Sequence, residues 1–87
     1  MNEDRWAGFK ARLDEVHDWP DSYTFKVVAP VAQVDRVLAL MGDPEHSRRV
    51  SKNGTYVSLT VEFIAQGSDE VLELYRKVSV VDGVILL

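Results

Sequence analysis

The residues with the clearest capacity for chemistry are the two histidines, because an imidazole can bind a metal ion or transfer a proton. His46 follows Asp43 and Glu45, so two carboxylates lie close to one imidazole in the sequence, and His17 stands apart from this segment. A metal site needs several such ligands converging from a fixed backbone, whereas these three residues share a turn. We therefore interpret the segment as a solvated loop, and we expect neither a metal nor another cofactor.

Signatures of nucleophilic catalysis and of phosphate-binding loops are missing from the sequence. A catalytic triad needs a nucleophile, a base and an orienting group in contact, and no G-x-S-x-G turn presents a serine. Neither a P-loop nor a G-x-G-x-x-G segment occurs. The sequence therefore predicts a protein without enzymatic activity.

Basic, aromatic and hydroxyl side chains recur at positions that share the open face of a predicted sheet, namely Lys26, Arg49, Tyr56 and Ser58. Such a combination can bind a single-stranded nucleic acid through its phosphates and bases. Charged residues on an edge strand also prevent unwanted strand pairing, and the stacked aromatics of the RNA-recognition signature are missing. We favour the second interpretation and keep weak binding of RNA or other single strands as the alternative function.

Composition and charge narrow the class of protein. A chain of 87 residues, 46% hydrophobic and 28% charged, is expected to fold as one small domain with a thin core. The absence of cysteine excludes disulfides, iron–sulfur clusters and cysteine zinc sites. A net charge of −4 argues against an affinity based on neutralising phosphates. With neither a signal peptide nor an apolar run approaching the ~18 residues of a membrane span, we expect a cytoplasmic protein without a membrane partner.

The first segment predicts an amphipathic helix. Trp6, Phe9, Leu13 and Val16 recur at spacings of three and four residues, which places them on one helical face. The helix should end before Trp19-Pro20, because proline moves its predecessor out of the helical region. Residues 1–18 are therefore expected to form a helical extension in front of a domain at 19–87.

The rest of the chain alternates between periods typical of strands and of helices. The elements expected are a strand at 23–28, a helix at 30–41, two hairpin strands within 47–66, a helix starting at 68 and a strand at 84–87. This βαββαβ order predicts a ferredoxin-like α+β sandwich, in which a four-stranded antiparallel sheet carries two helices on one face. The N-terminal helix is additional to that fold.

The hairpin has a specific expected turn. Asn53-Gly54 is typical of a two-residue type I′ turn, in which both residues have positive φ. Such a turn pairs Val50 with Val57 and places Arg48 on the core side. Either Arg48 extends its charged end to solvent at a sheet edge, or a bulge resets the register.

Apolar surface remains after the sheet and its helices are assigned. The front helix and the last strand both carry it, at Trp6, Phe9, Leu13, Val84, Ile85 and Leu86. The helix could cover the last strand of its own domain, or these residues could bind a partner, either a second copy paired along the final strand or another protein. We favour the intramolecular arrangement and treat the same residues as the candidate surface for a partner or a homodimer.

The order of several short motifs resembles a known family. Trp19-Pro20 is followed by Tyr-Thr-Phe-Lys-Val at 23–27, by Ser-Lys-Asn-Gly-Thr-Tyr-Val-Ser at 51–58 and by Leu74-Tyr75. Across residues 19–87 the chain is similar to the YbeD-like family, the bacterial domain of unknown function 493. It differs from that family in its longer front helix and in a shorter, arginine-bearing stretch at 45–50.

The resemblance implies a βαββαβ fold similar to the ACT-type regulatory domains of amino-acid metabolism, and it brings no established activity. It therefore leads us to expect a small regulatory or protein-interaction module. Such a module would bind a partner protein or a small metabolite, and it would act as a homodimer.

Overall fold

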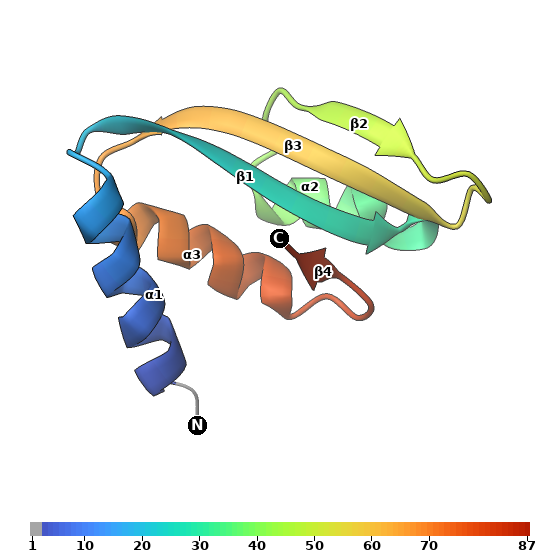
Figure 1. Cartoon of the computed structure of the whole chain (residues 1–87). Helices are drawn as coiled ribbons and strands as arrows, with labels where there is room; N and C mark the ends of the chain where they lie inside the picture. Colours follow the sequence, from blue (N-terminus) through green and yellow to red (C-terminus); the bar gives the residue numbers. More distant parts are fainter. Residues whose placement is uncertain (1–2) are drawn as a thin grey trace.

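The structure is a computed structural model that describes residues 3–87 (Figure 1). Asn2, whose side chain predicts an N-cap for the first helix, lies outside these residues. The elements in chain order are α1 (Glu3–Val16), β1 (Asp21–Pro30), the 3₁₀ helix η1 (Val31–Gln33), α2 (Val34–Leu40), β2 (Ser47–Val50), β3 (Tyr56–Ala65), α3 (Ser68–Ser79) and β4 (Ile85–Leu86). The Trp19–Pro20 peptide bond between α1 and β1 is cis.

The four strands form one sheet in the order β2-β3-β1-β4, and each neighbouring pair is antiparallel. β1 and β3 pair from Asp21↔Ala65 to Pro30↔Tyr56. Helices α2 and α3 lie on one side of the sheet, and α1 lies beside α3 (Figure 1). The predicted α+β class with a four-stranded antiparallel sheet is confirmed, and the arrangement is consistent with a ferredoxin-like sandwich.

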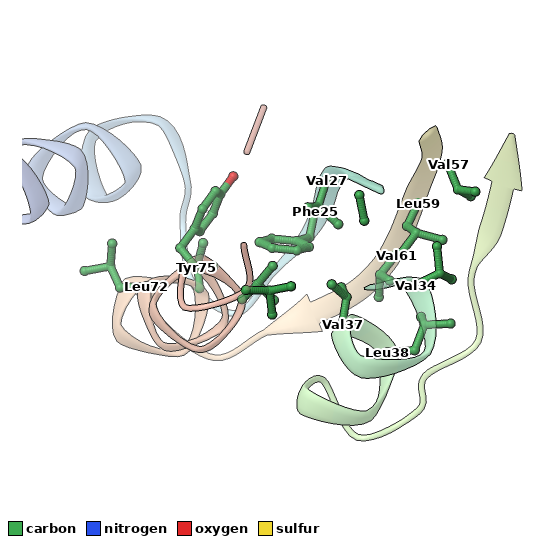
Figure 2. Packing of buried hydrophobic residues seen from close by; sticks show 14 of the residues in the cluster. Phe25, Val27, Val34, Val37, Leu38, Val57, Leu59, Val61, Leu72 and Tyr75 are labelled. Carbon is green, nitrogen blue, oxygen red and sulfur yellow. The ribbon is translucent and has the colours of Figure 1, made fainter. Parts of the chain in front are cut away.

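Alternate residues of the two central strands form the floor of the core. Phe25 and Val27 of β1 and Leu59 of β3 are fully buried, as the period of two in a strand requires. Val37 of α2 and Val71 of α3 cover them from the helical side. Figure 2 shows side chains of both helices meeting those of the strands. Burial of each such side chain contributes about 1.5–3 kcal/mol.

Helix α1 covers its own domain. Leu13 is 6% exposed and joins the core, whereas Trp6 and Phe9 are partly buried against it. Val16 was expected on the same apolar stripe but is 76% exposed, because it is the last residue of α1, where the chain turns toward β1. The Lys10 ammonium fastens the helix to α3 by donating to Ser68 Oγ at 2.8 Å and pairing with Asp69 at 3.1 Å.

The helix expected at 30–41 is shorter than predicted. Pro30 is the last residue of β1, and α2 begins only at Val34. Val31–Gln33 form a 3₁₀ turn before it, and the Val31 N–H donates to the Thr55 carbonyl at 3.0 Å, which binds this segment to the hairpin loop. The helix ends just before Gly42, as expected, because the φ of +85° at Gly42 is the left-handed conformation that glycine favours.

The hairpin keeps the expected register but closes with a different turn. Arg48 lies opposite Leu59 without a bulge and extends to solvent, where its Nη2 donates to His46 Nε2 at 3.0 Å. The type I′ prediction was wrong, because Gly54 N–H donates to the Ser51 carbonyl at 2.9 Å and Asn53 does not have positive φ. Ser51 explains the difference, since its Oγ accepts from the Tyr56 N–H at 3.1 Å and closes a longer loop.

Candidate functional site

One edge of the sheet is only half covered. β4 pairs with β1 at Val27 and Val28, and the Leu87 N–H donates to the Lys26 carbonyl at 3.3 Å. In an antiparallel strand, alternate residues direct their backbone groups to the same side. Because Lys26 faces β4, Thr24 and Ser22 face the same side beyond the end of β4. We call positions 22–24 the free edge.

The two outward-facing residues of the free edge differ in their partners. The Ser22 N–H donates to Asp21 Oδ1 at 2.8 Å, so a side chain already satisfies it. Thr24 is exposed, and within residues 3–87 no strand pairs with it on this side. An unpaired N–H and C=O at a sheet edge can accept another strand. Thr24 is therefore a position at which this edge of the sheet is open to such pairing.

An apolar hollow of 300 Å³ lies beside the free edge, between α1, α3, β1 and β4. We call it the edge groove, and it is lined by Trp6, Phe9, Tyr23, Tyr75, Leu86 and Leu87. None of these lining side chains carries a charge. The groove therefore suits apolar or aromatic groups.

Tyr75 connects the walls of the edge groove. Its ring lies 4.7 Å from that of Phe25 and 5.0 Å from that of Phe9, both edge-on, and 6.5 Å from that of Trp6. Edge-to-face ring pairs of this kind are stabilising beyond simple burial. Figure 2 shows the Tyr75 ring rising from α3 beside Phe25. One side chain thus joins α3 to α1 and β1.

The Tyr75 hydroxyl adds a polar link to the last strand. It donates to the Leu87 carbonyl at 3.2 Å, and the Tyr23 hydroxyl lies 3.0 Å from it. Because the single Tyr75 proton is used toward Leu87, Tyr23 must donate to Tyr75. Burial, followed by the hydrogen bond with Tyr23, raises the pKa of Tyr75. The hydroxyl therefore stays protonated and holds the chain end against α3.

Polar contacts at the junction of α1 and β1 fix the outer wall of the groove. The Trp19 indole N–H donates to Asp14 Oδ1 at 2.9 Å, and this bond is the main cause that lowers the pKa of Asp14. The His17 ring stacks on Trp19 and its Nδ1 donates to Asp21 Oδ2 at 2.8 Å, which is the main cause that lowers the pKa of Asp21. These bonds hold the end of α1 beside the start of β1.

A second hollow, of 530 Å³, lies on the sheet face opposite the helices. We call it the open-face hollow, and its lining residues are Val28, Arg49, Val50, Ser51, Lys52, Tyr56 and Ser58. Three of the four predicted open-face residues, Arg49, Tyr56 and Ser58, therefore lie together. Lys26 is exposed on the same face, two residues before Val28, but does not line the hollow.

The predicted partner surface does not form one patch. Trp6, Phe9 and Leu86 meet in the edge groove, but Leu13 is in the core and Val84 is partly buried against it. Ile85 pairs with Val28 and thus lies on the open face, 52% exposed. The period of two in the last strand makes this division necessary, since neighbouring residues point to opposite faces.

The sequence did not single out Tyr23, Tyr75 and Leu87 as site residues. Tyr75 falls on the sheet-facing side of its helix, where a hydroxyl needs a hydrogen-bond partner. This need for a partner was the one signal in the sequence that could have identified Tyr75 as a site residue. It could not identify the partners, because they lie on β1 and at the chain end.

The two histidines have hydrogen-bond partners in the fold. His46 Nδ1 donates to the Pro44 carbonyl at 3.0 Å, while Nε2 accepts from Arg48. Within residues 6–87, no three His, Asp or Glu side chains are grouped so that they could hold a metal ion. None of the helices in this part of the chain has the length and apolar character to cross a bilayer.

Comparison with known proteins identifies a family and several relatives of similar length. Residues 14–87 match the family model described as "Protein of unknown function (DUF493)". A UPF0250 protein of Shewanella woodyi is 34% identical over 80 residues, covering 84% of this chain and 91% of the relative. UPF0250 proteins of Shewanella amazonensis and Shewanella putrefaciens are each 32% identical, covering 83% and 84% of this chain and 90% and 91% of the relatives. No solved structure matches the chain, so the similarity to ACT-type domains stays a prediction.

Proposed function

The chain belongs to the DUF493 family, and because that description states no activity, we propose from the geometry that it is a non-catalytic protein-interaction module that binds an extended segment of a partner protein. The segment would join the sheet as a strand along the free edge of β1. The observation that carries the proposal is the outward-facing backbone of Thr24, unpaired by any strand of residues 3–87 and adjacent to the edge groove.

The register of β4 defines how such a segment would lie. Leu86 pairs with Val27 and Leu87 follows opposite Lys26, so a segment continuing this line would meet Phe25, Thr24 and Tyr23 in turn. The residue opposite Thr24 would exchange backbone hydrogen bonds with it. Its two neighbours, opposite Phe25 and Tyr23, would direct their side chains toward the groove. The partner is therefore an extended segment with apolar residues at alternate positions.

The contact is small, which sets the expected affinity. Two apolar side chains would each contribute about 1.5–3 kcal/mol, and each backbone hydrogen bond about 0.5–1.5 kcal/mol. Association and ordering of the segment oppose this gain by several kcal/mol. We expect a Kd in the micromolar range or weaker, which is typical of transient interactions through a single strand.

A segment of another protein fits the free edge better than a second copy of this chain. A copy would have to present a strand, and its own β1 is flanked by β3 on one side and partly by β4 on the other. Only the start of β1 is free, so two copies of β1 could overlap over a few residues before the β4 strands collide. A charged small metabolite finds no side chain of opposite charge in the groove lining.

The test uses a fluorescein-labelled peptide, Lys-Thr-Val-Thr-Val-Thr-Lys, and versions with Leu or Phe in place of both Val. Fluorescence anisotropy measures their binding to the full chain. We expect at least one of the three peptides to bind saturably. The variant Thr24→Pro should abolish this binding, because it removes the outward N–H while the hydrogen bonds to β3 are kept.

Arg48→Pro is the matched control. Ser51 N–H donates to Tyr56 in β3, so Arg48, three positions earlier, faces the outer edge of β2 as Thr24 faces that of β1. The Arg48→Pro variant should therefore bind the peptides with the affinity of the wild type. Phe9→Ser keeps the free edge but opens the groove, and should weaken binding about tenfold. Wild-type affinity in both Thr24→Pro and Phe9→Ser, or no binding of any of the three peptides, would contradict the proposal.

A further inference from the structure

The open face and its hairpin loop carry three cationic side chains, Lys26, Arg49 and Lys52. Among residues 6–87, whose side chains the structure describes, the ion pairs involve Lys10 and His17, and none of Lys26, Arg49 and Lys52 takes part in one. These three side chains also make no hydrogen bond with any residue from 6 to 87. The chain as a whole carries a net charge of −4, so this face reverses the overall sign. A local concentration of unpaired positive charge attracts an anion.

The open-face hollow surrounds this charge with hydroxyl donors. The strand register aligns Arg49 with Ser58, and Ser58 with Val28, across three strands. Ser51 Oγ accepts from a backbone N–H, which leaves its own proton to donate elsewhere. The carboxylate of Glu62 is on the same face but about 13 Å along β3 from Ser58. The hollow is thus lined by cations and hydroxyls around an apolar floor.

We propose that the open-face hollow binds a nucleotide. Arg49 and Lys52 would hold the phosphate, the hydroxyls of Ser51 and Ser58 would donate to phosphate or ribose oxygens, and the base would lie on the Tyr56 ring. A single phosphate would leave most of the 530 Å³ unfilled, whereas ligand sites of about 300–1,000 Å³ suit a molecule of nucleotide size. Tyr56 is 41% exposed, so its ring is accessible to a base.

The same chemistry occurs in a free mononucleotide and in single-stranded RNA. Only one cation of the group, Lys26, lies outside the hollow, and the overall charge of −4 repels additional phosphates. These features favour the free mononucleotide as the source. The experiment therefore compares both sources directly.

The experiment titrates the full chain with adenosine 5′-monophosphate, octa-adenylate RNA and inorganic phosphate, and follows binding by isothermal calorimetry and NMR shifts. We expect saturable binding of adenosine 5′-monophosphate, with shifts confined to β2, the hairpin loop and the facing parts of β3 and β1. The double variant Arg49→Gln/Lys52→Gln should weaken it at least about tenfold, because two charge-assisted hydrogen bonds are lost.

The charge-matched control is Arg36→Gln/Lys77→Gln, which removes two exposed cations from α2 and α3 on the other side of the sheet. It should bind like the wild type. If the octa-adenylate RNA binds more tightly than eight independent nucleotides would, and if its affinity falls steeply as salt is added, the result supports the site and identifies single-stranded RNA as its ligand. Equal weakening in both double variants, phosphate binding as tight as that of the nucleotide, or no binding of either nucleotide probe would overturn the proposal.

Discussion

Tyr75 shows how one residue can combine a packing role with a polar one. Its position on the sheet-facing side of α3 follows from the helical period of the sequence. Its hydroxyl partners do not, because Leu87 is 12 residues away and Tyr23 is 52 residues away along the chain. Such a link depends on the packing of three elements, which no local pattern encodes.

We expect Tyr75→Phe to lower the free energy of unfolding by about 0.5–1.5 kcal/mol. The ring contacts with Phe9 and Phe25 are kept, and only the hydrogen bonds to Leu87 and Tyr23 are lost. Tyr56→Phe is the control, since its exposed hydroxyl makes none of the hydrogen bonds of the structure, and it should be neutral. Urea unfolding measures both. Equal stability of the two variants would contradict the role given to the Tyr75 hydroxyl.

At the scale of elements, the position of α1 depends on polar contacts at its end. The amphipathic pattern predicted the helix and its buried Leu13, but not the bonds from Trp19 to Asp14 and from His17 to Asp21. These bonds form only because the chain reverses after Val16 and brings the linker back against the helix. A helical period carries no information about that reversal.

Acid should therefore weaken the attachment of α1. The pKa values of Asp14 and Asp21 are lowered in the folded chain, from an ordinary value of 3.8. A lowered pKa contributes stability above the ordinary value, and this contribution is lost as the pH falls through the folded value. We expect the urea midpoint of the wild type to fall more steeply between about pH 5 and pH 2 than that of Asp14→Asn/Asp21→Asn.

The charge-matched comparison for this experiment is Asp35→Asn/Asp82→Asn. It removes two exposed carboxylates that take part in none of the ion pairs or side-chain hydrogen bonds among residues 6–87. Parallel pH curves for the two double variants would show that the contacts of Asp14 and Asp21 do not stabilise the fold.

The turn into β4 is a second element-scale constraint. Gly83 has a φ of +82°, and a Cβ there would lie 2.8 Å from Pro30 Cγ, in a ring that cannot rotate away. We expect Gly83→Ala to cost about 1–3 kcal/mol and to loosen β4. Gly8→Ala is the opposite case, since nothing lies within 4 Å of its Cβ position in α1, and it should gain about 0.5–1 kcal/mol. Thermal unfolding measures the stability of both variants relative to the wild type. A Gly83→Ala chain as stable as the wild type would contradict the constraint at Gly83.

The sheet shows which features of an element the sequence can predict and which it cannot. Alternation in β3 and the Asn53-Gly54 signal were sufficient for the register between β2 and β3. The turn type was not predictable from that dipeptide, because the Ser51 side chain competes for the Tyr56 N–H. Likewise, Pro30 suits a helix start by its own geometry, but pairing with β3 keeps it in β1.

At the scale of the whole molecule, the chain presents two surfaces of different chemistry. The edge groove is uncharged and adjoins the free edge, whereas the open-face hollow is cationic and lies across the sheet. Trp6 and Phe9 of the groove precede the range matched by the family model, which begins at residue 14, while the free edge and Tyr75 lie inside it. The strand edge is thus in the part of the chain shared with the family, and α1 adds the wall that makes it a groove.

The most direct test of strand addition is the hydrogen exchange of the Thr24 amide, followed by NMR with and without a saturating peptide. The Phe25 amide serves as an internal reference, because it faces β3 and is paired already. We expect Thr24 to exchange fast in the free chain and slowly in the complex, while Phe25 stays protected in both. A Thr24 amide that is protected in the free chain, or that exchanges equally fast at saturation, would contradict the account.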